Sequence, residues 1–163
     1  RGTSRRAAEA AARATLATEI AALPAASGGT VGARARDPAV TARLDAAVAN
    51  AYAIAAEPET DGSWHVTMAV PIEAVRQALD GERALPAAGD AGPPVVIVDG
   101  ASTAAPAVGW TVGGLHAATV WVEAVPAWAK TAPHASASAV RGGAIDLAAS
   151  AGTPATLYVI LTK

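Results

Sequence analysis

The sequence predicts an α+β protein, with two helices on a small antiparallel sheet within residues 4 to 80 and a β-rich half after them. Three observations predict this class. Apolar residues recur at every fourth position near the amino terminus, they alternate with polar residues between Trp64 and Val70, and they form continuous runs after residue 94. The first spacing is typical of a helix, the second of a half-buried strand and the third of a fully buried strand.

Two helices are predicted in the first fifty residues. The first runs from Arg5 to Leu23 and ends before Pro24, because proline has no N–H to donate within a helix. Its apolar face is made by Ala8, Ala12, Leu16 and Ile20. The second runs from Pro38 to Ala49, since aspartate before proline is a strong signal for the start of a helix.

A β-hairpin is predicted between Tyr52 and Val70, with its turn at the sequence Thr60-Asp61-Gly62-Ser63. Alternation places Trp64, Val66, Met68 and Val70 toward the helices. His65 and Thr67 then face outward or toward a neighbour. A short helix containing Ile72, Val75 and Leu79 follows and ends at Asp80-Gly81.

Residues 81 to 94 are rich in glycine and proline and form the predicted linker between residues 1 to 80 and residues 95 to 163. Four strands are predicted in the second half: Val95–Val98, Ala118–Val125, Ala144–Ala148 and Ala155–Leu161.

Composition excludes some classes of protein. A net charge of −2 and a pI near 5.9 provide no attraction to nucleic acid, so we expect no nucleic-acid partner. The charge is uneven, because residues 1 to 44 hold seven arginines against three acids, whereas residues 45 to 99 hold nine acids against two arginines. This pattern indicates either solvated faces or head-to-tail attraction between copies.

The chain has no cysteine, and no apolar run reaches the roughly 18 residues that span a bilayer. It begins at Arg1 without a methionine. We therefore expect that an amino-terminal segment, such as a signal peptide, has been removed.

Several short strings carry a resemblance to a known family. They are the Ala/Arg-rich segment of residues 4 to 14, Thr30-Val31, Ala42-Arg43-Leu44, the strand pair of residues 61 to 71 (DGSWHVTMAVP), and the apolar strand of residues 94 to 99. In this order they resemble the LPP-twenty lipoprotein family, whose members include FlgP-like flagellar proteins.

The resemblance covers about residues 4 to 80 and implies a structural protein of the bacterial envelope, periplasmic or associated with the outer membrane. Members are typically anchored by an amino-terminal lipid and assemble into larger bodies. This chain lacks the cysteine that accepts the lipid. Its only expected contact with a membrane is therefore an anchor lost with the amino terminus, unless this relative is secreted without a lipid.

We expect no catalytic, cofactor-binding or metal-binding residues. His65, His116 and His134 show no ligand spacing, and we place the last two in loops. The sequence has no Gly-x-Ser-x-Gly motif, which would present a serine nucleophile on a sharp turn. The stretch containing Gly113 and Gly114 has neither phosphate-binding pattern and is better explained as a hairpin turn.

The leading hypothesis is a non-enzymatic envelope protein that self-assembles or attaches to other envelope proteins. Its candidate interface residues are Arg5, Arg6, Arg13, Trp110, Trp121 and Trp128. We expect Trp121 in the core and Trp128 at the surface. The alternative is a carbohydrate-binding or peptidoglycan-binding module that uses Trp110 and Trp128 as stacking surfaces; a hydrolase ranks third.

A last expectation concerns strand edges. Val95–Val98 and Thr156–Leu161 are β-prone and have few charges nearby. We expect that one of them, or the segment with Trp121 and Trp128, pairs with another copy or another envelope protein.

Overall fold

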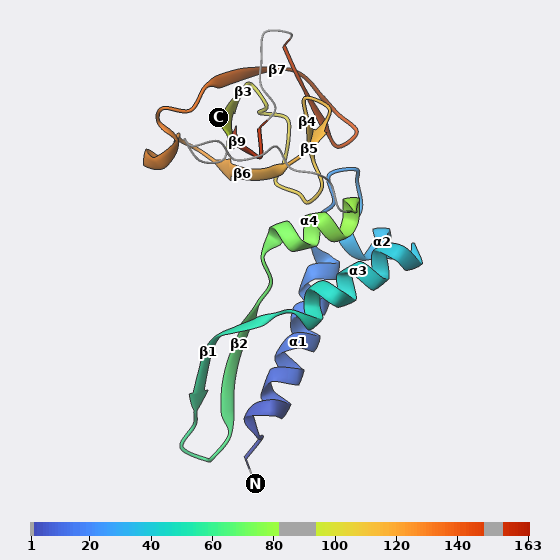
Figure 1. Ribbon diagram of the computed structural model, residues 1–163, viewed down its shortest axis with the longest axis vertical. Helices are drawn as coiled ribbons and strands as arrows, with labels where there is room; N and C mark the ends of the chain where they lie inside the picture. The colour runs from blue at the N-terminus through green and yellow to red at the C-terminus, as the bar shows by residue number, and fades with distance from the viewer. Residues whose placement is uncertain (1, 82–93, 149–154) are drawn as a thin grey trace. The chain divides into compact units, whose positions relative to one another are not determined.

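The computed structural model describes residues 2 to 81, 94 to 148 and 155 to 163. These residues contain four α-helices and two sheets, which confirms the α+β class (Figure 1). The chain divides into two compact units, the first made of Arg1–Leu23 with Thr30–Gly81 and the second of Pro24–Gly29 with Glu82–Lys163. The predicted linker falls almost wholly outside the described residues.

The first unit holds the four described α-helices and a two-stranded antiparallel sheet (Figure 1). Its elements are α1 (Arg5–Ala22), α2 (Val31–Arg34), α3 (Pro38–Ala49), β1 (Tyr52–Pro58), β2 (Trp64–Ala69) and α4 (Ile72–Asp80). The two long helices and the helix after the hairpin lie where the sequence predicts them. The single turn of α2 was not predicted.

Side chains directly before α1 and α3 cap these helices, and the second of them belongs to the predicted start signal Asp37-Pro38. The Ser4 hydroxyl accepts the N–H of Ala7 at 3.3 Å, and Asp37 accepts the N–H of Ala39 at 2.9 Å with proline next to it in the first turn. An N-cap acceptor satisfies one of the amide groups that have no partner within the helix. The helix boundaries are therefore set locally.

The hairpin packs on α1 through β2. Met68 is buried and Trp64 and Val66 are half-buried, whereas His65 and Thr67 are exposed. The two faces predicted from the alternation are therefore confirmed. Helix α3 packs on α1 and on α4, and the Arg43 Nε atom donates to the carbonyl of Ala78 at 2.7 Å.

One charged side chain of α4 is buried. Arg76 is 5% exposed and donates through Nε and Nη2 to the two carboxylate oxygens of Glu73, at 2.8 and 2.6 Å. A longer contact of 3.5 Å joins it to Asp80. Hydrogen bonding to Glu73, with the charges of both acids, raises the pKa of Arg76, so this guanidinium stays charged despite its burial.

The second unit is built on a seven-stranded mixed sheet with strand order β5-β4-β8-β7-β3-β9-β6. Its elements are β3 (Val95–Asp99), β4 (Thr111–Val112), β5 (Leu115–His116), β6 (Ala118–Val122), the 3₁₀ turn η1 (Ala127–Ala129), β7 (His134–Arg141), β8 (Ala144–Leu147) and β9 (Leu157–Leu161). The four predicted strands are present, β3 with one residue more than predicted and β6, β8 and β9 with fewer. Strands β4, β5 and β7 were not predicted, and His116 and His134 lie in strands rather than loops.

The expectation of a free edge at the first or last strand of this half is wrong. Strand β3 pairs in parallel with β7 and β9, and β9 pairs in parallel with β3 and β6. Both are therefore interior strands, and their high apolar content reflects burial on both faces. Among the described residues, the sheet ends at β5 on one side and at β6 on the other.

Both faces of this sheet carry apolar clusters. One cluster contains Val98, Trp110, Ile145 and Ile160, and the other contains Ile97, Val159 and Ala129. The two antiparallel pairs of the sheet, β4 with β5 and β7 with β8, are joined by Gly113-Gly114 and Gly142-Gly143, whose four φ angles are positive. Such glycine pairs suit the tight turns that match the twist of a hairpin.

The short segment Pro24–Gly29 belongs to the second unit although it lies between α1 and α2 in the sequence. Its Ala26 N–H donates to the carbonyl of Val108 at 2.8 Å, and the Val108 N–H donates to the carbonyl of Pro24 at 2.9 Å. The sequence prediction had placed this segment with the amino-terminal part of the chain.

Candidate interaction surfaces

The three tryptophans of the second unit lie in different environments. Trp110 is only 7% exposed, packs on Trp121 with ring centroids 5.8 Å apart, and donates its indole N–H to the carbonyl of Ala105 at 3.1 Å. Trp121 is half-buried against the same cluster. Because the Trp110 ring is enclosed, it offers no face to a sugar, and the carbohydrate hypothesis loses that residue.

Trp128 lies on η1 and is 60% exposed. Its neighbour Ala129 is buried in the smaller apolar cluster, which fixes the turn that carries the indole ring. An exposed tryptophan on an anchored turn is a common feature of binding surfaces.

The three candidate arginines lie on α1. Arg5 forms an ion pair with Glu9 at 2.9 Å and lies over the ring of Trp64, so its charge is used within the same copy. Arg6 is exposed. Arg13 is half-buried, and its Nε atom has no hydrogen-bond partner in the described part of the chain. Of the three arginines, Arg6 is therefore the exposed one to which no contact within the described residues is assigned.

Two large apolar side chains project from β1. Tyr52 is 53% exposed and Ile54 is 61% exposed. The register shifts between Ala53 and Ala55, so Ile54 has no opposite residue on β2 within the fully described hairpin. Ile54 lies two residues after Tyr52, so alternation places both side chains on the same exposed side of β1.

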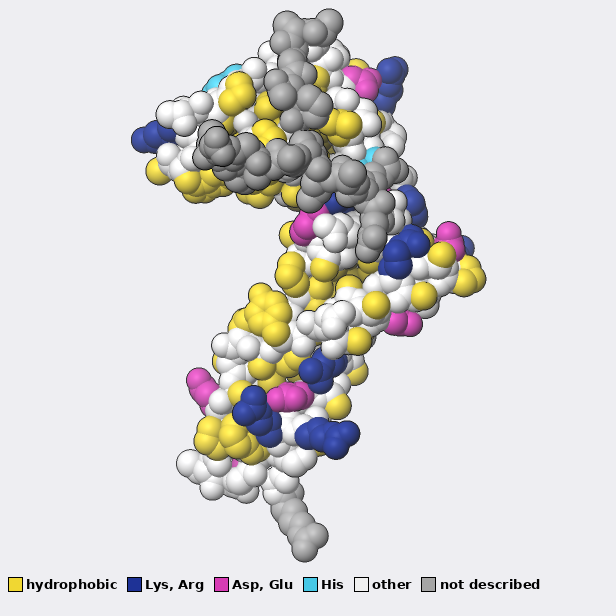
Figure 2. All heavy atoms as spheres, viewed as in Figure 1, with side chains coloured by type: hydrophobic (Ala, Val, Ile, Leu, Met, Phe, Trp, Pro, Cys, Tyr) yellow, Lys and Arg dark blue, Asp and Glu magenta, His cyan; other side chains and the backbone are white. Residues whose placement is uncertain are grey.

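The far end of the same hairpin is acidic. Glu57, Glu59 and Asp61 are exposed, and the hairpin contains no lysine or arginine. The Asp61 carboxylate accepts the hydroxyl of Ser63 at 2.6 Å and its N–H at 2.9 Å. These hydrogen bonds lower the pKa of Asp61 and keep the turn negatively charged. In Figure 2 acidic, basic and hydrophobic side chains lie close together over this end of the first unit.

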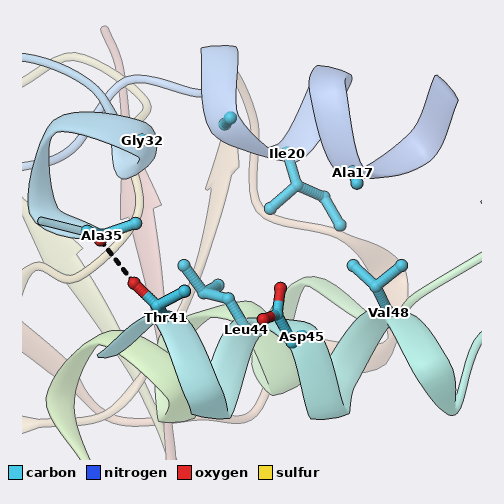
Figure 3. A pocket seen from close by; sticks show the side chains of 9 residues that line it. Ala17, Ile20, Gly32, Ala35, Thr41, Leu44, Asp45 and Val48 are labelled. Atoms are coloured by element: carbon cyan, nitrogen blue, oxygen red, sulfur yellow. Dashed lines mark hydrogen bonds between the residues drawn. The ribbon is translucent and has the colours of Figure 1, made fainter. Parts of the chain in front are cut away.

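A small hollow lies between α1, α2 and α3 (Figure 3). Its volume is about 120 Å³, and most of its lining is apolar: Ala17, Ile20, Ala21, Gly32, Ala35, Leu44 and Val48, with Thr41 and Asp45 as the polar members. The Thr41 hydroxyl donates to the carbonyl of Ala35, so it is satisfied within the fold. The hollow can therefore accept an aliphatic group.

Strand β6 is a free edge of the larger sheet within the described residues. Its five residues, Ala118–Val122, include no charge and no proline, and the first charge after them is Glu123, which pairs with Lys163 at 2.7 Å. Natural edge strands usually carry such charges or prolines to prevent pairing with another chain. Within the described residues no strand pairs with this edge, and its sequence lacks these protections.

The clearest polar pair of the second unit joins Asp99 and His134. The Oδ2 atom of Asp99 is 2.7 Å from Nδ1 of His134, and both side chains are about half exposed. Across the described ranges, no three histidine, aspartate or glutamate side chains gather where they could hold a metal ion.

A helix that crosses a bilayer needs about 20 mostly apolar residues. None of the helices in the described ranges combines the length and the apolar content needed to cross a membrane.

The sequence alone did not identify Ile54 or the hollow. Alternation from Tyr52 is compatible with an exposed Ile54, but no local pattern showed that the bulge leaves it without an opposite residue on β2. The hollow depends on how three helices meet, which no local pattern reports. Comparison with known proteins finds no matching family model, no matching curated protein and no matching solved structure.

Proposed function

We propose that this protein is a non-enzymatic structural component of the bacterial cell envelope, which acts by binding other protein surfaces, either further copies of itself or other envelope proteins. The observation that carries the proposal is the hairpin, whose β1 strand exposes Tyr52 and Ile54 on a two-stranded sheet covered on one face by α1. Two strands alone are marginally stable in water, and exposed apolar side chains on them are typical of an unfinished interface.

The edge of β6, with which no described strand pairs, and the exposed Trp128 support the same proposal in the second unit. The envelope location, periplasmic or at the outer membrane and with a link to flagella, rests on the resemblance of residues 4 to 80 to LPP-twenty lipoproteins. The proposal includes no cofactor and no nucleic-acid partner.

Sedimentation velocity across a wide range of protein concentration, at low and at physiological salt, tests the proposal. We expect species larger than a monomer. Alternatively, we expect a stable complex with an envelope protein when the chain is produced in a bacterium that has LPP-twenty lipoproteins. A strict monomer at every concentration, together with no co-purifying envelope protein, would contradict it.

A second candidate function is binding of cell-wall glycans, which the exposure of Trp128 favours. Quenching of tryptophan fluorescence by peptidoglycan fragments, and its loss in Trp128→Ala with an unchanged circular dichroism spectrum, would support this candidate. Trp121 is half-buried on the larger cluster, so Trp121→Phe provides a control that leaves the exposed ring in place.

A further inference from the structure

We propose that the hollow between α1, α2 and α3 binds the side chain of a lysine on a partner protein. The aliphatic part of this lysine lies among the apolar lining, and its ammonium group lies against the carboxylate of Asp45. The choice of a partner's lysine, rather than a free amine, rests on the proposed function. The hollow itself belongs to the first unit, because all its lining residues do.

Asp45 is the charged residue of a mostly apolar hollow. It lies on α3 with Thr41, Leu44 and Val48, at the spacing of one stripe along a helix. In Figure 3 one of its carboxylate oxygens points from α3 toward α1. The residues of α1 that line the hollow are all apolar, so α1 presents no side chain that could pair with this charge.

The carboxylate of Asp45 is available to a cation from outside. The residues three and four positions away on α3, where a helical ion pair would form, are Thr41, Ala42, Val48 and Ala49. The arginine of α3, Arg43, donates to the carbonyl of Ala78 instead. No ion pair within the described ranges includes Asp45, and the residue is exposed, so a ligand can reach it from solvent.

The size of the hollow suits one unbranched aliphatic chain. An apolar cavity of roughly 150 Å³ holds a benzene molecule, and the hollow measures about 120 Å³. Lysine side chains commonly bury their aliphatic stem against apolar surface and leave the ammonium group at the edge. A Cβ atom at Gly32 would lie 3.0 Å from the carbonyl oxygen of Ala21, so this glycine lets α2 line the hollow close to α1.

The charge and the size together favour lysine over other side chains. A leucine or isoleucine would fill the apolar part, but it would displace water from the carboxylate without replacing the hydrogen bonds of that water. The planar head of arginine is bulkier than the compact ammonium group of lysine, and a hollow of about 120 Å³ leaves less room for it.

The first test uses small probes of equal chain length. n-Butylamine, n-butanol and butyrate are titrated into the chain, and the amide shifts of Gly32, Ala35 and Asp45 are followed by NMR. We expect n-butylamine to bind most tightly and butyrate least. Its dissociation constant should be about millimolar, because so small a ligand makes few contacts.

The second test removes the charge. Asp45→Asn should weaken binding of n-butylamine by about threefold to fivefold and leave that of n-butanol unchanged, since an exposed ion pair contributes no more than this. Glu19→Gln is the matched control, because it removes an equal charge from an exposed residue of α1 that does not line the hollow. Ala17→Leu should weaken binding of both probes by filling the hollow. Circular dichroism checks that each variant is folded.

The third test presents lysine as it occurs within a protein. Nα-Acetyl-lysine methylamide should shift the same amide signals as n-butylamine, and the corresponding arginine derivative should bind more weakly. If n-butylamine binds and the lysine derivative does not, the site takes only free amines, and a partner's lysine is the wrong ligand.

The remaining outcomes also decide the inference. Binding of n-butylamine no tighter than that of n-butanol, or equal losses in Asp45→Asn and Glu19→Gln, would overturn it. Sedimentation velocity separates it from the proposed function. If the chain assembles or retains an envelope protein but binds no amine, the lysine site is wrong and the proposed function stands. If the lysine derivative binds to a chain that is monomeric and without a partner, the site stands and the proposed function is contradicted.

Discussion

The guanidinium of Arg5 lies 5.7 Å from the centre of the Trp64 ring, which joins the first turn of α1 to the first residue of β2. The same side chain forms an ion pair with Glu9 on the next turn of the helix. A cation over an aromatic face and an ion pair four residues along a helix each stabilise a fold modestly. Together they hold the turn end of the hairpin against α1.

Replacing Arg5 by alanine is expected to lower the free energy of unfolding by about 1 kcal/mol, because both contacts are lost. Arg6→Ala is the control, since Arg6 is exposed on the same turn and removes the same charge. Urea denaturation of both variants measures the difference. Equal effects of the two substitutions would show that charge alone, and not the contact with Trp64, matters.

Arg76 and Arg141 provide a contrast between a buried and an exposed ion pair. The Arg76 side chain is 6% exposed, whereas that of Arg141, 3.1 Å from Asp146, is 80% exposed. We expect Arg76→Ala to cost about 2–3 kcal/mol, because it removes charged hydrogen bonds and leaves acids beside a buried void. Arg141→Ala should change stability by less than about 0.5 kcal/mol. Thermal and chemical unfolding measure the stability of both variants. Similar losses of stability would contradict the larger contribution expected from the buried ion pair of Arg76.

The hairpin turn is expected to respond to acid through Asp61. Hydrogen bonds from the Ser63 hydroxyl and N–H lower the pKa of Asp61 in the folded chain. A lowered folded pKa means that the carboxylate stabilises the turn at any pH above about 4, and that this contribution disappears as the pH falls through the lowered value.

In Ser63→Ala one of these donors is lost, so the pKa of Asp61 should rise toward its ordinary value. Titration of the carboxyl carbon by NMR measures the change. An unchanged titration would show that the backbone N–H of residue 63 alone sets the pKa.

Two adjacent glycines test how closely the segment Pro24–Gly29 lies against the β7–β8 hairpin. A Cβ atom at Gly143 would lie 2.9 Å from the carbonyl carbon of Ala26, whereas one at Gly142 meets no atom within 4 Å. Both glycines have positive φ, so alanine at either costs about 1–2 kcal/mol of backbone strain. Gly143→Ala should cost a further 1–3 kcal/mol or so by overpacking. Equal losses of stability would contradict this close approach.

Much of the first unit follows from local sequence. Asp37-Pro38 starts α3, Ser4 caps α1, and the alternation from Trp64 to Met68 predicts which side of β2 is buried. These signals act over a few residues, so they can be interpreted without knowledge of the fold.

The second unit depends on pairings between distant residues, and here the sequence was less informative. The apolar runs of β3 and β9 predict strands, but only their further pairing, of β3 with β7 and of β9 with β6, shows that they are interior. Trp110 occupies a loop-like stretch rich in glycine, and its burial depends on Trp121 and on the carbonyl of Ala105. The hollow was harder still to predict, because it depends on how α1, α2 and α3 pack.

The position of Pro24–Gly29 in the second unit has a consequence for how the protein can be divided. The second unit is a discontinuous domain, since its chain includes six residues that precede most of the first unit. A fragment that begins at Pro94 would lack the backbone groups that pair with Val108. During synthesis these six residues emerge long before Val108, with which they exchange backbone hydrogen bonds. Cutting or permuting the chain at residue 81 would therefore not yield two independently complete halves.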